Sequence, residues 1–233
     1  MIEHPIKVSV VIPCLNEEAS VGICVGKALK SFASQDVAGE VIVVDNGSTD
    51  RSLLVAASAG ARVVEETVRG YGAAYLRGFR EARGHFIVMA DADDTYDLSD
   101  LDPFLRPLEE GYDFVMGSRF RGKIQKGAMP WANRYLGNPV LTSLYRLFFR
   151  TRLSDIHCGM RSFTKQAYQS LNLHCLGMEF ASEMVMEALL KKLKIIEVPI
   201  DYAKRKGISK LSPVKDAWRH LRFMLLFCPT WLY

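Results

Sequence analysis

Residues 88–97 read VMADADDTYD, an apolar run that ends in four aspartates. Aspartate is disfavoured in strands, and its charge is costly to bury without a partner. The apolar residues of 85–91 predict a buried strand, so the carboxylates of Asp91, Asp93 and Asp94 would gather where that strand ends. This concentration of negative charge requires either a bound cation or a structural use for each carboxylate.

The same strand belongs to a regular alternation of short apolar runs and helical patterns. Runs rich in Val and Ile that alternate with helices predict a mostly parallel sheet covered by helices on both faces, which is a Rossmann-like α/β fold. In such sheets, ligands bind beyond the carboxyl ends of the strands. The predicted strands cover 8–13, 40–45, 61–66, 85–91 and 112–118, and the predicted helices cover 17–32, 52–60, 72–84 and a short stretch from Pro103.

The second half has fewer strands. Helices are predicted over 133–150 and 179–192, and an edge strand over 193–202, because Pro199 cannot donate a hydrogen bond to a neighbour. We expect one domain over 1–212. The segment 213–233 contains WRHLRFMLLFCPTWLY and predicts an amphipathic, membrane-associated helical extension.

Composition narrows the class of protein. The 233 residues carry a net charge of +4, which is mild, although basic residues cluster over 204–222 and would suit phosphate or anionic lipid. The five cysteines match no zinc or redox spacing and predict reduced thiols in the cytoplasm. The first residues do not resemble a signal peptide, and no run reaches the roughly 18–20 apolar residues of a membrane span.

Two interpretations of the aspartates remain open on local sequence. Asp100 or Asp102 could cap the helix that Pro103 opens, but capping does not explain Asp91 and Asp93 at the strand end. These two carboxylates flank Ala92, a small residue that lets a ligand approach closely. A divalent ion such as Mg²⁺ binds one or two carboxylates together with substrate phosphates, which favours a nucleoside diphosphate bridged by metal.

Two other predicted strands end in polar residues. The sequence IPCLNEE follows the first strand, and VVDNGSTD follows the second. Asp45 could contact a ribose hydroxyl or a base edge. It could also stabilise the Asn-Gly turn, with Ser48 or Asp50 as a helix cap, and we expect this structural role to be filled as well.

Six motifs together carry a resemblance to a known family. In chain order they are VVIPCLNEE, VIVVDNGSTD, RGYGAA, MADADDTY, GSRF and DIHCGMRSF. This set resembles the family 2 glycosyltransferases with the GT-A fold, and within them the dolichyl- or polyprenyl-phosphate mannose and glucose synthases. The resemblance extends from about residue 8 to residue 230.

The resemblance implies a role for each matching position. Asp93 would be the chief ligand of Mg²⁺ or Mn²⁺, and Asp91 a second ligand or a nucleotide contact, as in the family's D-x-D motif. The basic segment KRKGISK would close over phosphates. The other implied substrate-binding residues are Pro13, Leu15 and Glu17 at base and ribose, Asp45 at the base, Ala92 within the motif, Arg119 at the donor phosphates or the acceptor, and Lys204, Arg205, Ser209 and Lys210 in the basic segment.

The motif DIHCGMRSF is open to two interpretations. The resemblance implies catalytic roles, with Asp155 near the acceptor and Arg161 on the acceptor phosphate. The structural alternative is a salt bridge that shapes a loop. We discount His157 as a base, because a phosphate monoester is mostly dianionic at neutral pH and needs charge and alignment more than deprotonation.

The function implied is inverting transfer of a hexose from UDP-glucose or GDP-mannose to a polyprenyl phosphate. The enzyme would lie at the cytoplasmic face of a membrane, held by the aromatic and basic helix 133–150 and the segment 213–233, or by membrane helices beyond residue 233. For 133–150, an ordinary amphipathic helix packed on the sheet is an equal alternative. One alternative is a family 2 enzyme that acts on a sugar or glycolipid hydroxyl and needs Asp155 as a base. Another is a nucleotide-sugar-binding subunit without activity. A nucleic-acid partner is not expected.

Overall fold

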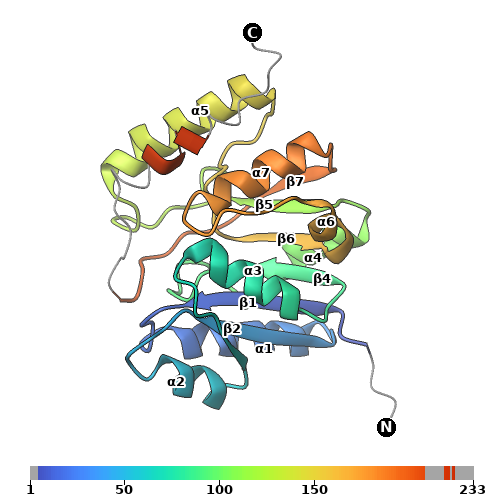
Figure 1. Ribbon diagram of the computed structural model, residues 1–233, viewed down its shortest axis with the longest axis vertical. Coiled ribbons are helices and arrows are strands. Elements are labelled where there is room, and N and C mark those ends of the chain that lie inside the picture. Colours follow the sequence, from blue (N-terminus) through green and yellow to red (C-terminus); the bar gives the residue numbers. More distant parts are fainter. Residues whose placement is uncertain (1–4, 208–217, 221, 224–233) are drawn as a thin grey trace.

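Seven strands form one sheet in the order β3-β2-β1-β4-β6-β5-β7 (Figure 1). The computed structural model describes residues 5–207, 218–220 and 222–223. All neighbouring strands are parallel except at β6, which runs antiparallel to both β4 and β5. The strands are β1 (Val8–Cys14), β2 (Gly39–Asp45), β3 (Arg62–Glu65), β4 (Phe86–Met89), β5 (Phe114–Ser118), β6 (Arg161–Thr164) and β7 (Ile195–Pro199).

Helices cover both faces of the sheet, as the alternation predicts. On one face pack α1 (Val21–Ser34), α2 (Ser52–Ser58) and α4 (Asp102–Glu109). On the other pack α3 (Tyr71–Glu81), α5 (Asn138–Phe149), α6 (Lys165–Ser170) and α7 (Phe180–Leu190). Successive side chains of a strand point to opposite faces, so Val10 and Ile12 join the first core and Val11 joins the second.

Three features of the second half differ from the expectation, and one of them is the short helix α6, which was not predicted. Strand β6 was not predicted, because three of its four residues lie inside the motif DIHCGMRSF and the strand is too short to show a period. The helix predicted over 133–150 begins with a π-helical turn, Asn133–Gly137, and becomes α5 at Asn138. The edge position predicted for the strand with Pro199 is confirmed, since β7 is the last strand of the sheet.

Little of the C-terminal segment can be compared with its prediction. Residues 218–220 and 222–223 are helical, and they lie near α5 and α7 (Figure 1). Phe223 is buried in the second core, and His220 Nδ1 lies 2.7 Å from the Ser182 hydroxyl of α7. The other residues of 213–233 lie outside the described part of the chain.

The contact between α3 and the sheet depends on Gly78. A Cβ atom at this position would lie 2.3 Å from Val11 Cγ1 and 2.9 Å from Val44 Cγ2. We therefore expect Gly78→Ala to lower the free energy of unfolding by about 1–3 kcal/mol through overpacking, measured by urea denaturation. Gly26→Ala on α1 is the matched control, because no atom lies within 4 Å of its added Cβ. This control should be neutral or stabilising by up to about 1 kcal/mol, and an equal loss in both variants would contradict the packing argument.

Candidate active site

The carboxyl ends of β1, β2 and β4 meet at one edge of the sheet. Cys14 of β1 lies opposite Asp45 of β2, and Val11 of β1 lies opposite Met89 of β4. The chain that follows β4 therefore carries Asp91 and Asp93 to the edge that also holds Glu17 and Asp45. The parallel register thus brings together the polar strand ends that the sequence predicts as a ligand site.

The loop after β4 holds Asp93 and Asp94 in different environments. Oδ1 of Asp93 accepts hydrogen bonds from the Thr95 hydroxyl at 2.6 Å and the Thr95 amide at 3.1 Å. Asp94 has a left-handed backbone conformation. Its carboxylate forms salt bridges with Lys27 Nζ at 2.8 Å and with Lys206 Nζ at 2.7 Å. Both carboxylates are largely buried. Asp94 therefore has a structural use in two ion pairs, whereas Oδ2 of Asp93 lies 3.5 Å from the Arg205 guanidinium.

A basic segment after β7 runs along this loop. The Ala203 amide donates to Thr95 O, and the Lys206 amide donates to Asp93 O. Between these two contacts, the Arg205 guanidinium lies 2.6 Å from Glu17 Oε1 and 3.5 Å from Asp93 Oδ2. Of the predicted basic segment, Arg205 and Lys206 contact carboxylates of the acidic site, whereas the Lys204 amide donates to Gln125 Oε1. Ser209 and Lys210 lie outside the described residues, and the contact of this segment with phosphates remains a prediction.

Arg205 places a positive charge between two carboxylates of this site. The guanidinium contacts carboxylates that come from two different strand ends, Glu17 after β1 and Asp93 after β4. In the part of the chain that the structure describes, no group of three or more His, Cys, Asp or Glu side chains could hold a metal ion by itself. This donor set fits Mg²⁺ or Mn²⁺, which bind one or two carboxylates and complete their coordination with phosphate oxygens and water.

Asp91 is held by tyrosines of α3. Its Oδ1 accepts from the Tyr71 hydroxyl at 2.9 Å and from the Tyr75 hydroxyl at 3.3 Å. Desolvation, reinforced by the negative charge of Asp93, raises the pKa of Asp91 to about 6, against the lowering effect of the Tyr71 hydrogen bond. Neither tyrosine was predicted as a site residue, although a helix that starts with two tyrosines four residues apart places their rings on one face.

The raised pKa of Asp91 has a consequence for stability. An aspartate in the unfolded chain titrates near 3.9, so between pH 4 and 6 the folded protein holds this proton more tightly. The free energy of unfolding should therefore fall as pH rises through the folded-state pKa, and the loss should be complete by about pH 7. We expect Asp91→Asn to be more stable than the parent by about 1–3 kcal/mol at pH 7 and no more stable at pH 4, in urea denaturation. Carbon-13 NMR of the carboxyl group tests the same point, and a midpoint near 4 would contradict it.

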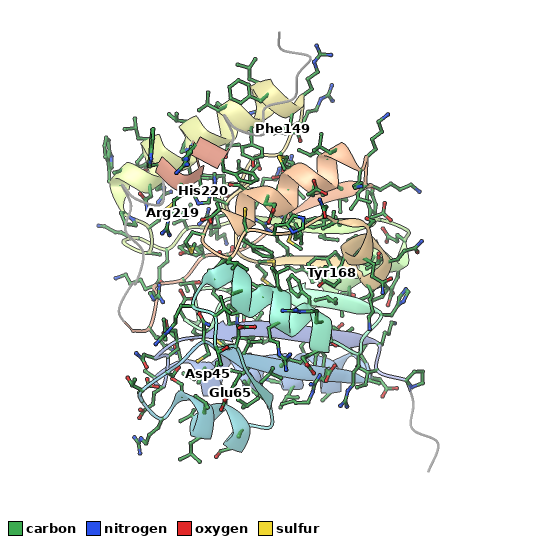
Figure 2. All side chains as sticks on the ribbon, in the orientation of Figure 1. Asp45, Glu65, Phe149, Tyr168, Arg219 and His220 are labelled. Carbon is green, nitrogen blue, oxygen red and sulfur yellow. The ribbon has the colours of Figure 1, made fainter. Side chains whose placement is uncertain are left out.

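The turn after β2 is built as expected. Asp45 accepts from the amides of Gly47 at 2.9 Å and Ser48 at 3.1 Å, and Gly47 has a φ of 86°. Asp50 accepts from the Ser52 amide at the start of α2. The predicted structural role of Asp45 is confirmed, and its contact with a nucleotide remains a prediction. Figure 2 shows Asp45 at the α2 end of the molecule, far from Arg219 and His220 beside α5.

The motifs GSRF and DIHCGMRSF meet in a buried ion pair. Arg119 Nε and Nη2 each lie 2.7 Å from a carboxylate oxygen of Asp155, and the Arg119 amide donates to the same carboxylate. Asp155 is fully buried, and Arg119 is 7% exposed. This geometry favours the structural alternative of a salt bridge that shapes a loop over direct acceptor contact by Asp155 or Arg119.

Arg161 also differs from its implied role. Its side chain is fully buried on β6, and its guanidinium donates to the carbonyl oxygens of Cys158, Ala181 and Ile156 at 2.8–2.9 Å. These bonds tie the motif loop to α7. The expected contact of Arg161 with an acceptor phosphate is therefore not seen, because its three guanidinium nitrogens serve backbone carbonyls.

Known proteins are similar to this chain in sequence and in architecture. Residues 9–171 match the model of Glycosyl transferase family 2. The chain belongs to this family. Agl6, a low-salt glycan biosynthesis hexosyltransferase of Haloferax volcanii, is 44% identical over 97% of this chain. The alignment covers 54% of Agl6, so this chain spans about half the length of that relative. A dolichyl-phosphate hexose transferase of the same organism is 32% identical over 88% of this chain and 86% of its own length.

Solved structures confirm the GT-A fold. Mannosyl-3-phosphoglycerate synthase from Rubrobacter xylanophilus superposes with a TM-score of 0.77 and 20% identity, over 95% of this chain and 73% of that one. Glucosyl-3-phosphoglycerate synthase from Mycobacterium tuberculosis superposes with a TM-score of 0.74 and 21% identity, over 95% of this chain and 80% of that one. That structure was solved with Mn²⁺, UDP and glucosyl-3-phosphoglycerate. The resemblance to family 2 and the mostly parallel α/β sheet are thus both confirmed.

Proposed function

We propose that this chain transfers a hexose from a nucleotide diphosphate sugar to a polyprenyl phosphate at a membrane surface, with inversion at the sugar C1. The observation that carries the proposal is the Arg205 guanidinium between Glu17 and Asp93, because it marks a cation-attracting site at the strand ends where nucleotides bind. The dolichyl-phosphate hexose transferase and the hexosyltransferase among the relatives support the reaction class.

A divalent cation bound here would neutralise the charge that develops on the departing nucleoside diphosphate. Asp93 would hold that cation through Oδ2, and the fixed Asp91 would support it or contact the nucleotide. Arg205 and Lys206 would exchange their carboxylate partners for donor phosphates, since both already lie on this edge. The acceptor phosphate oxygen would attack C1 as the bond from C1 to the diphosphate oxygen breaks, and no covalent enzyme intermediate forms.

The acceptor proposal is supported by an exposed apolar surface near α5. Trp131 is 71% exposed, and Leu147 is 64% exposed. The side chains of Pro139, Val140 and Leu147 help to line an open hollow of about 330 Å³. Exposed aromatic and aliphatic side chains next to arginines are typical of helices that lie at a lipid interface. This surface is the proposed point of peripheral attachment at the cytoplasmic face. No described helix is both long and apolar enough to span a bilayer. The exposed apolar residues in and before α5 are Trp131, Tyr135, Leu136, Val140 and Leu147.

The proposal is tested by transfer to lipid. The protein is incubated with labelled UDP-glucose or GDP-mannose, with Mn²⁺ or with EDTA, and with anionic vesicles that contain polyprenyl phosphate. Label should enter the lipid extract with one donor, and only with Mn²⁺. Vesicles without polyprenyl phosphate and soluble 3-phosphoglycerate are the comparison acceptors. Transfer to 3-phosphoglycerate alone, or to a lipid hydroxyl in vesicles without polyprenyl phosphate, would overturn the acceptor proposal.

A further inference from the structure

Asp91 is fixed from two sides by parts of the chain that lie far apart in sequence. On one side, Tyr71 and Tyr75 of α3 both donate to Oδ1. Their rings pack edge to face with centroids 4.9 Å apart. Because a tyrosine hydroxyl can only donate to an ionised carboxylate, both hydroxyls hold the same oxygen in place.

On the other side, the carboxylate lies against the backbone of Gly159. A Cβ atom at Gly159 would be 2.5 Å from Asp91 Oδ2 and 3.1 Å from the Tyr96 hydroxyl oxygen. That hydroxyl oxygen in turn accepts a hydrogen bond from the Gly159 amide at 2.9 Å. A side chain at residue 159 would therefore overlap the present position of the Asp91 carboxylate.

Asp93 shows a parallel arrangement two residues later. Its Oδ1 is held by the hydroxyl and the amide of Thr95, and its Oδ2 faces Arg205. Both carboxylates of the motif are thus held through Oδ1 by neighbouring protein groups. A site that fixes its ligands in this way loses little conformational entropy when a cation arrives.

We propose that Tyr71 and Gly159 are positioning residues for the cation site, which set the orientation of Asp91 by a hydrogen bond and by a close backbone contact. The inference rests on the proposed function of this edge of the sheet. It gives the glycine of DIHCGMRSF and the tyrosine of RGYGAA a shared role, although they lie 88 positions apart in the chain.

The test measures nucleotide affinity by calorimetry with Mn²⁺ and again with EDTA, using UDP and GDP in parallel as probes. We expect Tyr71→Phe to weaken the Mn²⁺-dependent affinity about 10-fold and Gly159→Ala by about 10- to 100-fold, as is typical when partners of a metal ligand are removed. Affinity in EDTA should change less than about 2-fold relative to the parent. Tyr168→Phe is the matched control, because Tyr168 lies on α6 and packs against Phe79 and Phe163 (Figure 2).

The outcomes separate the two proposals. Parent-like Mn²⁺-dependent affinity in both Tyr71→Phe and Gly159→Ala would overturn the positioning role, even if the parent binds with Mn²⁺ as expected. Parent protein that binds nucleotide equally with Mn²⁺ and EDTA would instead overturn the cation site itself. An equal loss with Mn²⁺ and with EDTA in Tyr71→Phe would assign that residue a general packing role and would also contradict the inference. If Gly159→Ala does not fold, Tyr71→Phe decides alone, because it removes one hydroxyl and keeps the ring.

Discussion

Replacing Asp93 by asparagine is expected to lower kcat/KM for hexose transfer about 10³-fold. A bound cation stabilises the departing diphosphate by several kcal/mol, and each 1.36 kcal/mol changes the rate about 10-fold. Asparagine keeps the size of the side chain and its contact with Thr95 but removes the charge that Oδ2 presents toward Arg205. The measurement is transfer to lipid together with calorimetric binding of the donor in Mn²⁺ and in EDTA.

The binding data should separate the cation from the nucleotide. Donor affinity in EDTA should be unchanged or higher in Asp93→Asn, because a negative charge near the donor phosphates is gone. The stimulation by Mn²⁺ should be lost. Asp97→Asn is the matched control, since this aspartate lies in the same stretch but is 62% exposed and faces Lys27. Full Mn²⁺ stimulation in Asp93→Asn would contradict the assignment of Asp93 as the chief ligand.

Replacing Asp155 by alanine is expected to lower the free energy of unfolding by about 3–5 kcal/mol. The change leaves the Arg119 guanidinium buried without its bidentate partner, and an unpaired buried charge is far less favourable than a paired one. Urea denaturation measures the effect. Glu109→Ala, which removes an exposed ion pair with Lys7, should change stability by less than about 1 kcal/mol.

A double variant decides whether Asp155 acts on substrate. In Arg119→Met with Asp155→Leu, both charges are replaced by apolar groups of similar volume, which should restore much of the lost stability. If the pair is structural, this folded double variant should keep measurable transfer to polyprenyl phosphate. A stable double variant with no transfer would instead support direct contact with the acceptor. If the acceptor were a sugar or glycolipid hydroxyl, Asp155 would be needed as a base, and the double variant would be inactive with that acceptor.

Local patterns in the chain are sufficient to predict most of the elements and the place of the acidic site. Apolar runs of period two and helical runs of period 3.6 are properties of a few neighbouring residues, so β1, β2, β4 and α3 could be predicted closely. The carboxyl ends of parallel strands share an edge, and this rule alone is enough to expect Glu17, Asp45 and Asp93 at one site. The six motifs in their order identified the family.

Which polar residues are available for chemistry depends instead on the tertiary fold. In the sequence, Asp155 and Arg119 both resemble residues that bind substrate. In the folded protein they form a buried ion pair with each other. Arg161 serves three backbone carbonyls, because β6 inserts antiparallel between β4 and β5 and turns its side chain toward α7. Tyr71 and Gly159 meet at Asp91 only through this strand order. The physical reason is that burial and hydrogen-bond pairing depend on neighbours distant in sequence, whereas the patterns that a sequence shows directly are local.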